Sequence, residues 1–266
     1  MTIDTQKIAE TFAQARQAGT GLATYPGIKP ASLAQAYDVQ DQIVALIGRP
    51  VAGWKVGRIN GPQVDHLGAS RLAGPIFDDH VFYAAPGSMT SAPVYADGFV
   101  AAEAEFMMRI RRAPDPAKRS YSLDEAAEII DDIRVGIEIA SSPFPGINEN
   151  GAAVTASDLG NSKALVIGAP LNLALDSDFA NWPITVTVDG IPVGEAMASG
   201  LPDGPYGAVW FLLEHLADRG THLRAGQWIS TGAITGVHKI APGQHVIARF
   251  GRNYSLDCTT HAAQKM

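Results

Sequence analysis

The chain has 266 residues, a formal net charge of −7 and an apolar content of 46%. This composition is typical of a globular protein, and the length fits one large domain or one domain with a small addition. The basic residues do not cluster, which argues against nucleic acid or an anionic membrane surface as a partner.

Membrane insertion and secretion are not expected either. No stretch reaches the roughly 18 uninterrupted apolar residues that a membrane span requires. The N-terminal residues are polar and amphipathic, without the apolar core of a signal peptide. Cys258 is the only cysteine, so no disulfide can form within the chain. We therefore expect a cytoplasmic protein.

The first fifty residues are expected to be helical. Apolar residues recur at helical spacing within residues 4–18. Ser32 opens a second helix, with Gln35 three residues on in a capping-box pattern, and Gly48 ends it.

From residue 51 onward the pattern is mainly strand and turn. Residues 184–193 predict a hairpin, because Asp189-Gly190 supplies its turn. Residues 241–250 and 254–260 predict a second strand pair near the end.

Two helices interrupt these strands. One begins at Ser122, with Glu125 completing a capping box, and the other runs from about Tyr206 to Arg219. Short strands with a few helices indicate an α+β fold with a mostly antiparallel or mixed sheet. Nucleotide binding has no support, since no glycine-rich phosphate loop is present.

Two glutamates stand one residue apart in the apolar run VAAEAEFMMRI, residues 100–110. If this run is a strand, Glu103 and Glu105 share one face with Cα atoms about 7 Å apart. One interpretation is a half-exposed strand with a wet face. The other is a cation site, because neighbouring carboxylates repel unless solvent, a proton or a cation intervenes.

A second segment favours the cation. In RVGIEIASS, residues 134–142, Glu138 shares a strand face with the small residues Gly136 and Ala140, which leaves room above it. Three glutamates from two strands would form an oxygen-only site, which suits Mg²⁺ or Mn²⁺ and does not suit zinc.

Two further segments carry candidate polar groups. Lys55 lies between Gly53 and Gly57 on one strand face, either as an approachable cation or as an ordinary surface lysine between turn glycines. Asp158, Asn161 and Ser162 precede the apolar residues 164–167, either as site residues or as a polar loop.

In this order the segments resemble one family, the hydratase and decarboxylase branch of the fumarylacetoacetate hydrolase superfamily. This branch includes 2-keto-4-pentenoate hydratases, 2-oxo-hept-4-ene-dioate hydratases and 4-oxalocrotonate decarboxylases. The matching motifs cover nearly the whole chain. They are G-x-K-x-G at 53–57, E-x-E-F at 103–106, GIEI at 136–139, D-x-x-x-S at 158–162 with the following VIGAP, GAVWFLLEHLA at 207–217, and STGAITG with APGQHVIARFG between 230 and 251.

The resemblance implies a small N-terminal α/β region, residues 1–75, followed by a mixed β-sheet roll with the catalytic site, residues 76–266. It implies a divalent cation, Mg²⁺ or Mn²⁺, and assembly into homo-oligomers. The site residues that it implies are listed by role: Glu103, Glu105 and Glu138 as metal ligands, Lys55 and Asp158 as catalytic residues, and Asn161, Ser162, Thr231 and Arg58 at the substrate.

Two departures from the family pattern affect the expected substrate. Related hydratases continue after the lysine motif with Leu-Thr-Ser, whereas Arg58, Ile59 and Asn60 follow here. The acidic and basic run that follows GIEI in the family is replaced by residues 140–143, Ala-Ser-Ser-Pro.

The resemblance implies a hydratase that adds water to a 2-hydroxy-2,4-dienoate to give a 4-hydroxy-2-oxo acid in aromatic-compound catabolism. A 2-oxo acid chelates a divalent ion, which stabilises an enolate. Lys55 would add positive charge and Asp158 would shuttle a proton.

Three alternatives remain: decarboxylation of a vinylogous 2-oxo acid, hydrolytic C–C cleavage of an acylpyruvate, and a non-catalytic partner of a related enzyme. Hydrolysis ranks lower because no His-Glu pair stands in the N-terminal third.

Overall fold

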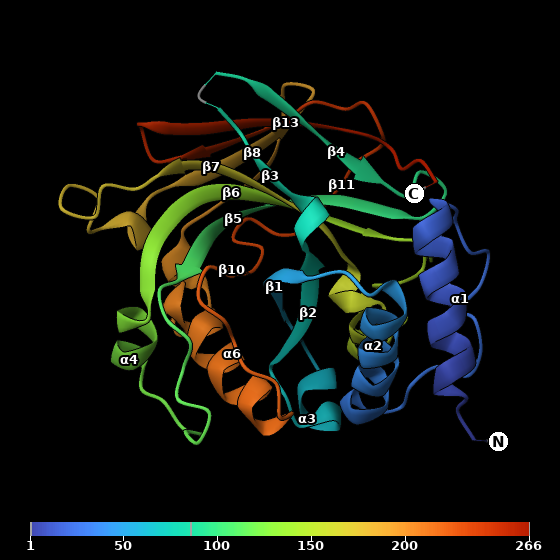
Figure 1. Ribbon diagram of the computed structural model, residues 1–266. Coiled ribbons are helices and arrows are strands. Elements are labelled where there is room, and N and C mark those ends of the chain that lie inside the picture. Colours follow the sequence, from blue (N-terminus) through green and yellow to red (C-terminus); the bar gives the residue numbers. More distant parts are fainter. Residues whose placement is uncertain (1, 86, 266) are drawn as a thin grey trace.

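A computed structural model describes residues 2–85 and 87–265 of the chain. Helices and strands alternate irregularly along it, which confirms the α+β class (Figure 1). The helices and 3₁₀ turns are α1 (Thr5–Ala18), α2 (Leu33–Ile47), α3 (Gln63–Leu67), η1 (Asp78–His80), α4 (Leu123–Glu128), α5 (Ala152–Ser157), η2 (Leu159–Asn161), η3 (Phe179–Asn181), η4 (Ala198–Gly200) and α6 (Tyr206–Asp218).

The strands vary in length from two to thirteen residues. They are β1 (Val51–Arg58), β2 (Arg71–Phe77), β3 (Val81–Tyr83), β4 (Met89–Val94), β5 (Phe99–Ile110), β6 (Ile130–Ser142), β7 (Ser162–Pro170), β8 (Ile184–Val188), β9 (Ile191–Ala196), β10 (Trp228–Ser230), β11 (His238–Lys239), β12 (Val246–Phe250) and β13 (Tyr254–Ala262).

Helix ends follow the local sequence closely. Ser122 and Glu125 form the complete capping box that was expected at α4. At α2, the hydroxyl of Ser32 accepts from the backbone of Gln35, but the Gln35 side chain accepts from Ala31 instead of Ser32. The second capping box is therefore only half formed.

In the described residues the strands form two mixed sheets. The larger has the order β2-β1-β10-β5-β6-β7-β3, with β11 also paired to β5, and the smaller has the order β4-β13-β12-β8-β9. The hairpin β8–β9 and the pair β12–β13 confirm the strand pairs expected from the sequence. In Figure 1 the long strands β5 and β6 curve around one side of the molecule.

The main core lies between the two sheets. The even-numbered residues of β5 face it, and the ring of Phe106 packs against the rings of Phe179 and Phe250 with centroids 4.9 and 5.3 Å apart. Because one face of β5 is committed to this core, its odd-numbered residues point to the opposite face, where Met107 packs with Ile76 of β2 and Trp228 of β10.

The N-terminal helices form a second core against the end of β5. Ile8 and Phe12 of α1 pack with Ile43 of α2 and with Phe99 and Phe144. The strands β1 and β2 extend the larger sheet, because β1 pairs in parallel with β10. The domain boundary at residue 75 stays a prediction. No helix that the structure describes has the length and hydropathy to cross a membrane.

Candidate metal centre and active site

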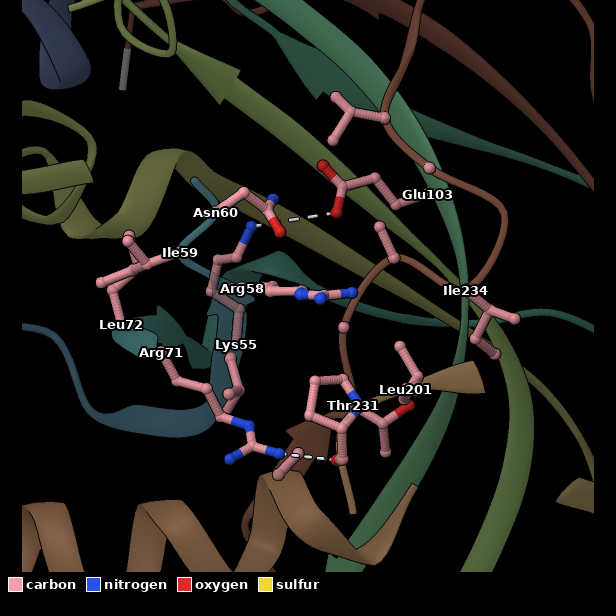
Figure 2. A pocket seen from close by; sticks show the side chains of 18 of the residues that line it. Lys55, Arg58, Ile59, Asn60, Arg71, Leu72, Glu103, Leu201, Thr231 and Ile234 are labelled. Carbon is pink, nitrogen blue, oxygen red and sulfur yellow. Dashed lines mark hydrogen bonds and ion pairs between the residues drawn. The ribbon is translucent and has the colours of Figure 1, made fainter. Parts of the chain in front are cut away.

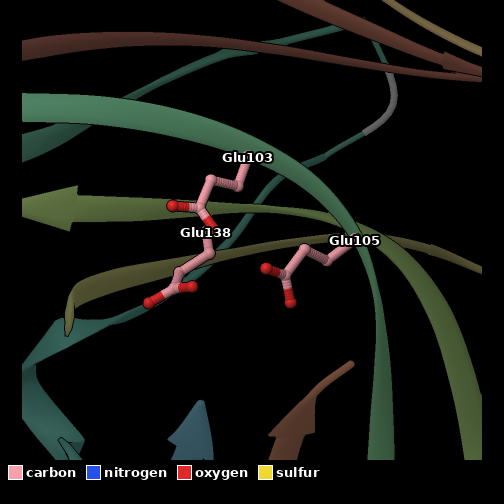
Figure 3. Close-up of side chains that lie close together, drawn as sticks. All are labelled: Glu103, Glu105 and Glu138. Carbon is pink, nitrogen blue, oxygen red and sulfur yellow. The ribbon is translucent and has the colours of Figure 1, made fainter. Parts of the chain in front are cut away.

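Three glutamates converge on the side of the larger sheet opposite to the core. Glu103 and Glu105 alternate along β5, and Glu138 lies directly opposite Glu103 on β6. One oxygen from each lies within 4.8 Å of the others (Figure 3). Glu103 is 3% exposed and the other two are fully buried, so the interpretation of a wet strand face is wrong.

The free oxygens of this cluster fit a divalent cation. Oε2 of Glu105 accepts hydrogen bonds from the Ser230 hydroxyl and, at 2.7 Å, from the Gly232 amide. Oε1 of Glu105 and Oε1 of Glu138 are buried and accept no hydrogen bond. Because a buried, unpaired carboxylate oxygen is costly, this oxygen-only donor set suits a hard ion such as Mg²⁺ or Mn²⁺.

Burial also changes the proton affinity of the cluster. It raises the pKa of Glu103 to about 7, since burial and the charge of Glu138 outweigh the opposing effects of Lys55 and of a hydrogen bond with Glu105. Burial, with the charges of Glu138 and Glu103, raises the pKa of Glu105 well above its ordinary value. Without a cation these carboxyl groups therefore hold protons more tightly than free glutamate does.

Lys55 of β1 reaches the same cluster. Its Nζ lies 3.1 Å from Oε2 of Glu138, 4.0 Å from Oε2 of Glu103 and 3.1 Å from Oδ1 of Asn161. Burial acts to lower the pKa of Lys55, but the charges of the three glutamates outweigh it and raise the pKa. Lys55 is therefore a protonated donor at neutral pH and not a base.

Asn161 orients this lysine from a constrained loop. Its backbone adopts the left-handed region, with φ of 56°, and its Nδ2 donates to Oδ1 of Asn148 at 2.8 Å. Because the amide nitrogen is held there, the amide oxygen is directed at Lys55.

A cavity of about 620 Å³ opens beside the cluster (Figure 2). Lys55 and Glu103 lie at its inner side. A dashed line in Figure 2 joins Nζ of Lys55 to Oε2 of Glu103. Arg58, Asn161 and Thr231 also line it, and their contact with substrate stays a prediction. The structure thus brings together Lys55, the three glutamates and three of the four residues expected at the substrate.

Ser162 is placed differently. It is 3% exposed and does not line the cavity, and its hydroxyl has no hydrogen-bond partner. Its backbone carbonyl accepts from Arg16 at 3.2 Å. The geometry therefore does not favour the expected contact between Ser162 and substrate.

Asp158 also lies outside the cavity lining. Its Oδ1 accepts from Nε of Arg16 at 2.6 Å and its Oδ2 accepts from the Ser142 hydroxyl at 2.6 Å, all within a fully buried environment. Both carboxylate oxygens are engaged by neighbours that fix them. This geometry does not favour the proton shuttle expected of Asp158, and its catalytic role stays a prediction.

Sequence reasoning missed Arg16 and Arg71. Arg16 lies four residues after Phe12 and eight after Ile8, so an arginine on the apolar face of α1 was an available signal. Arg71, which lines the cavity, begins an apolar strand and gave no such signal.

The room expected above Gly136 is filled by protein. A Cβ at this position would lie 2.5 Å from Cγ of Met107. Glycine is needed there because Met107 packs against the strand. The open space lies instead toward β1 and the Thr231 segment.

Comparison with known proteins finds relatives of low sequence identity. No family model matches the chain. A 4-oxalocrotonate decarboxylase from Pseudomonas sp. (strain CF600) is 24% identical over 224 residues, 82% of each chain. A 2-keto-4-pentenoate hydratase from Paraburkholderia xenovorans (strain LB400) is 24% identical over 243 residues, 90% of this chain and 88% of the relative.

Several solved structures have a fold similar to that of this chain. The 4-oxalocrotonate decarboxylase from Pseudomonas putida G7, complexed with magnesium and adipate, aligns with a TM-score of 0.77 and 20% identity over 96% of this chain and 97% of that chain. Fumarylpyruvate hydrolase from Pseudomonas aeruginosa, in complex with Mn²⁺ and pyruvate, aligns with a TM-score of 0.60 and 18% identity over 81% and 91%. A fumarylacetoacetate hydrolase family protein from yeast aligns with a TM-score of 0.53 and 13% identity over 78% and 91%.

The chain has the fumarylacetoacetate hydrolase fold. This confirms the resemblance drawn from the motifs, and the curated relatives come from its hydratase and decarboxylase branch. Within this fold, the described part of the chain places no histidine in the cavity lining. His66 lies on the exposed side of α3, and His80 is buried beside Lys163.

Proposed function

We propose that the protein is a divalent-metal-dependent hydratase. It adds water to a 2-hydroxy-2,4-dienoate, the enol form of a 2-oxo-alkenoate, to give a 4-hydroxy-2-oxo acid in aromatic-compound catabolism. The observation that supports this most is the convergence of Glu103, Glu105, Glu138 and Lys55 beside a cavity of about 620 Å³. The hydratase among the relatives and the Mg²⁺ and Mn²⁺ in the structural neighbours support it as well.

Mg²⁺ or Mn²⁺ is the proposed cofactor, held by the three glutamates. Such an ion supplies a Lewis acid that stabilises negative charge on the oxygens of a 2-oxo acid. Lys55 donates hydrogen bonds at the same end of the cavity and adds a positive charge where the enolate oxygen develops. Asn161 keeps Lys55 in this orientation.

Water addition needs groups that hold a water molecule near the substrate chain. The side-chain amides of Asn60, Gln63 and Asn148 line the cavity and offer both donors and acceptors. Thr231 lines it too, and its hydroxyl accepts from the Phe106 amide at 3.2 Å, which directs its proton away from that bond. These residues are the proposed water- and substrate-positioning groups.

Decarboxylation of a vinylogous 2-oxo acid is the second candidate. The decarboxylase relative and the decarboxylase structure with a TM-score of 0.77 favour it, because the same enolate-stabilising site serves both reactions. Hydrolytic C–C cleavage ranks lower, since no histidine of the described residues lines the cavity. A non-catalytic partner is disfavoured by the complete glutamate and lysine cluster.

A direct assay separates these reactions. The protein is mixed with 2-hydroxydienoates or acylpyruvates, with Mg²⁺, Mn²⁺ or a chelator, and the loss of dienoate absorbance is followed. Product analysis for added water, released CO₂ or a broken C–C bond identifies the reaction. We expect metal-dependent hydration that Glu105→Gln abolishes and that Arg249→Gln, an exposed change on β12, retains. Absence of metal-dependent turnover of any of these substrates would overturn the proposal.

A further inference from the structure

We propose that Arg58 binds a second carboxylate at the end of the substrate away from the metal ligands, so that the substrate is a dicarboxylic 2-hydroxydienoate. This inference rests on the proposed function and names the substrate class of the same site.

Two cations of β1, Lys55 and Arg58, line the same cavity. Lys55 and Arg58 are three residues apart, so their Cα atoms are separated by about 10 Å of strand. Lys55 is buried against the glutamates, whereas Arg58 is exposed. Figure 2 shows the guanidinium of Arg58 extending into the cavity. A substrate held at Lys55 therefore extends toward Arg58.

A second arginine makes the Arg58 position unusual. Arg58 stands directly opposite Arg71 on β2, and like charges in this arrangement are unfavourable. Arg71 is compensated, because its Nη2 lies 2.9 Å from Oδ2 of Asp203 and donates to the Pro202 carbonyl at 2.6 Å. Arg58 forms no side-chain hydrogen bond or ion pair with any residue that the structure describes. Its donors are free to bind a ligand.

The charge balance of the cavity also favours an anionic ligand at Arg58. A divalent cation held by the three glutamates would, together with Lys55, balance their three negative charges. Glu103 is the only acidic residue among the described residues that line the cavity. The charge of Arg58 is therefore left without a counter-charge, and a guanidinium pairs with a carboxylate through two parallel hydrogen bonds.

The wall between the two charged ends is apolar. Ile59 and Leu72 lie on one side of the cavity and Leu201 and Ile234 on the other, as Figure 2 shows. Such a wall suits an unsaturated carbon chain that carries a charge at each end. The cavity thus offers a metal end, an apolar middle and a cationic end.

Binding of the distal carboxylate by Arg58 also affects which reaction is favoured. In decarboxylation of a vinylogous 2-oxo acid, the distal carboxylate leaves as neutral CO₂, and its electron pair moves toward the metal end. A guanidinium that binds this carboxylate stabilises the starting state more than the transition state, and so slows its loss. Arg58 therefore favours a reaction that retains the distal carboxylate, as hydration does.

Binding of unreactive analogues tests the inference. We propose calorimetric titration of the Mg²⁺-loaded protein with 2-oxoadipate and with 2-oxohexanoate, which have the same number of carbons and differ by the distal carboxylate. We expect 2-oxoadipate to bind roughly 10- to 100-fold more tightly, as a charge-assisted bidentate pair predicts. In Arg58→Gln this ratio should fall to about one, and Arg58→Lys should retain part of it.

Controls separate this inference from the function on which it rests. Arg249→Gln removes an exposed arginine outside the cavity and should keep the wild-type ratio. Equal, Mg²⁺-dependent binding of both analogues by the wild-type protein would overturn the role of Arg58 and leave the metal-dependent function standing. Failure of both analogues to bind in a Mg²⁺-dependent way would overturn both. Thermal melts of each variant confirm that the protein is folded.

Discussion

Nζ of Lys55 lies 3.1 Å from Oε2 of Glu138, so the site lysine forms an ion pair with a proposed metal ligand. Removing the lysine therefore has two separable effects. It takes a hydrogen-bond donor from the substrate end, and it frees the glutamates to interact with a metal ion alone.

The first prediction concerns Lys55→Met. We expect turnover to fall by about 100-fold or more, the usual effect of removing a preorganised donor. The affinity for Mg²⁺ should stay the same or rise, because a competing cation is removed. Steady-state kinetics and Mg²⁺ titration calorimetry measure the two effects. Turnover at the wild-type rate would refute the role given to Lys55.

The second prediction concerns the metal ligands. At a Mg²⁺ concentration of about 100 times Kd, binding stabilises the native state by about 2.7 kcal/mol, which corresponds to a rise in Tm of about 5 to 10 °C. Glu105→Gln should lose this rise, and Glu195→Gln, an exposed change on β9, should keep it. An unchanged rise in Glu105→Gln would place the metal elsewhere.

The third prediction follows from Glu103. Burial and the charge of Glu138 raise its pKa to about 7 in the metal-free native state, above its ordinary value of 4.5. The native state then binds this proton more tightly than the unfolded chain does. The resulting stabilisation is complete below about pH 4.5 and is lost as the pH rises through 7. In chelator, Tm should therefore fall more steeply between pH 5 and 8 in the wild type than in Glu103→Gln.

Added Mg²⁺ should act in the opposite direction. Because the carboxyl group must release its proton to bind the ion, the rise in Tm caused by Mg²⁺ should grow from pH 5.5 to pH 8. Calorimetry in buffers of different ionisation enthalpy counts the released protons. No proton release near pH 6.5 would show that Glu103 is already ionised without metal.

The fourth prediction concerns the buried pair of Arg16 and Asp158. Arg16→Met leaves the Asp158 carboxylate without its partner, and breaking a buried pair in this way costs about 3 to 5 kcal/mol. Asp158→Asn should cost less stability and retain a metal-dependent rise in Tm. If Asp158 shuttled protons, Asp158→Asn would lose about 100-fold or more in kcat at temperatures where it is folded. We expect a much smaller loss.

Local sequence predicted much of the fold. The capping box at Ser122, the turn at Asp189-Gly190 and the alternation along β5 are properties of short segments, and each appears in the structure. The alternation alone places Glu103 and Glu105 on one face. The order of this motif with the others along the chain indicated the resemblance to the fumarylacetoacetate hydrolase superfamily.

What the sequence did not reveal depends on contacts between distant segments. The alternation of β5 cannot distinguish a wet face from a buried one, because burial depends on β1 and on the Thr231 segment. The engagement of Asp158 depends on Arg16, which is 142 residues away. The sequence of this loop therefore could not show that both oxygens of Asp158 are held by neighbouring side chains.

The parallel pairing of β1 with β10 has a consequence for how the protein is made. Lys55 is aligned with Ser230, so the strand that supplies the lysine acquires this neighbour only after most of the polypeptide has left the ribosome. Until then the carboxylates on β5 and β6 lack the Ser230 and Gly232 donors that hold Glu105. Chains interrupted before residue 228 should accordingly be unable to retain a catalytic ion, however well their N-terminal helices form.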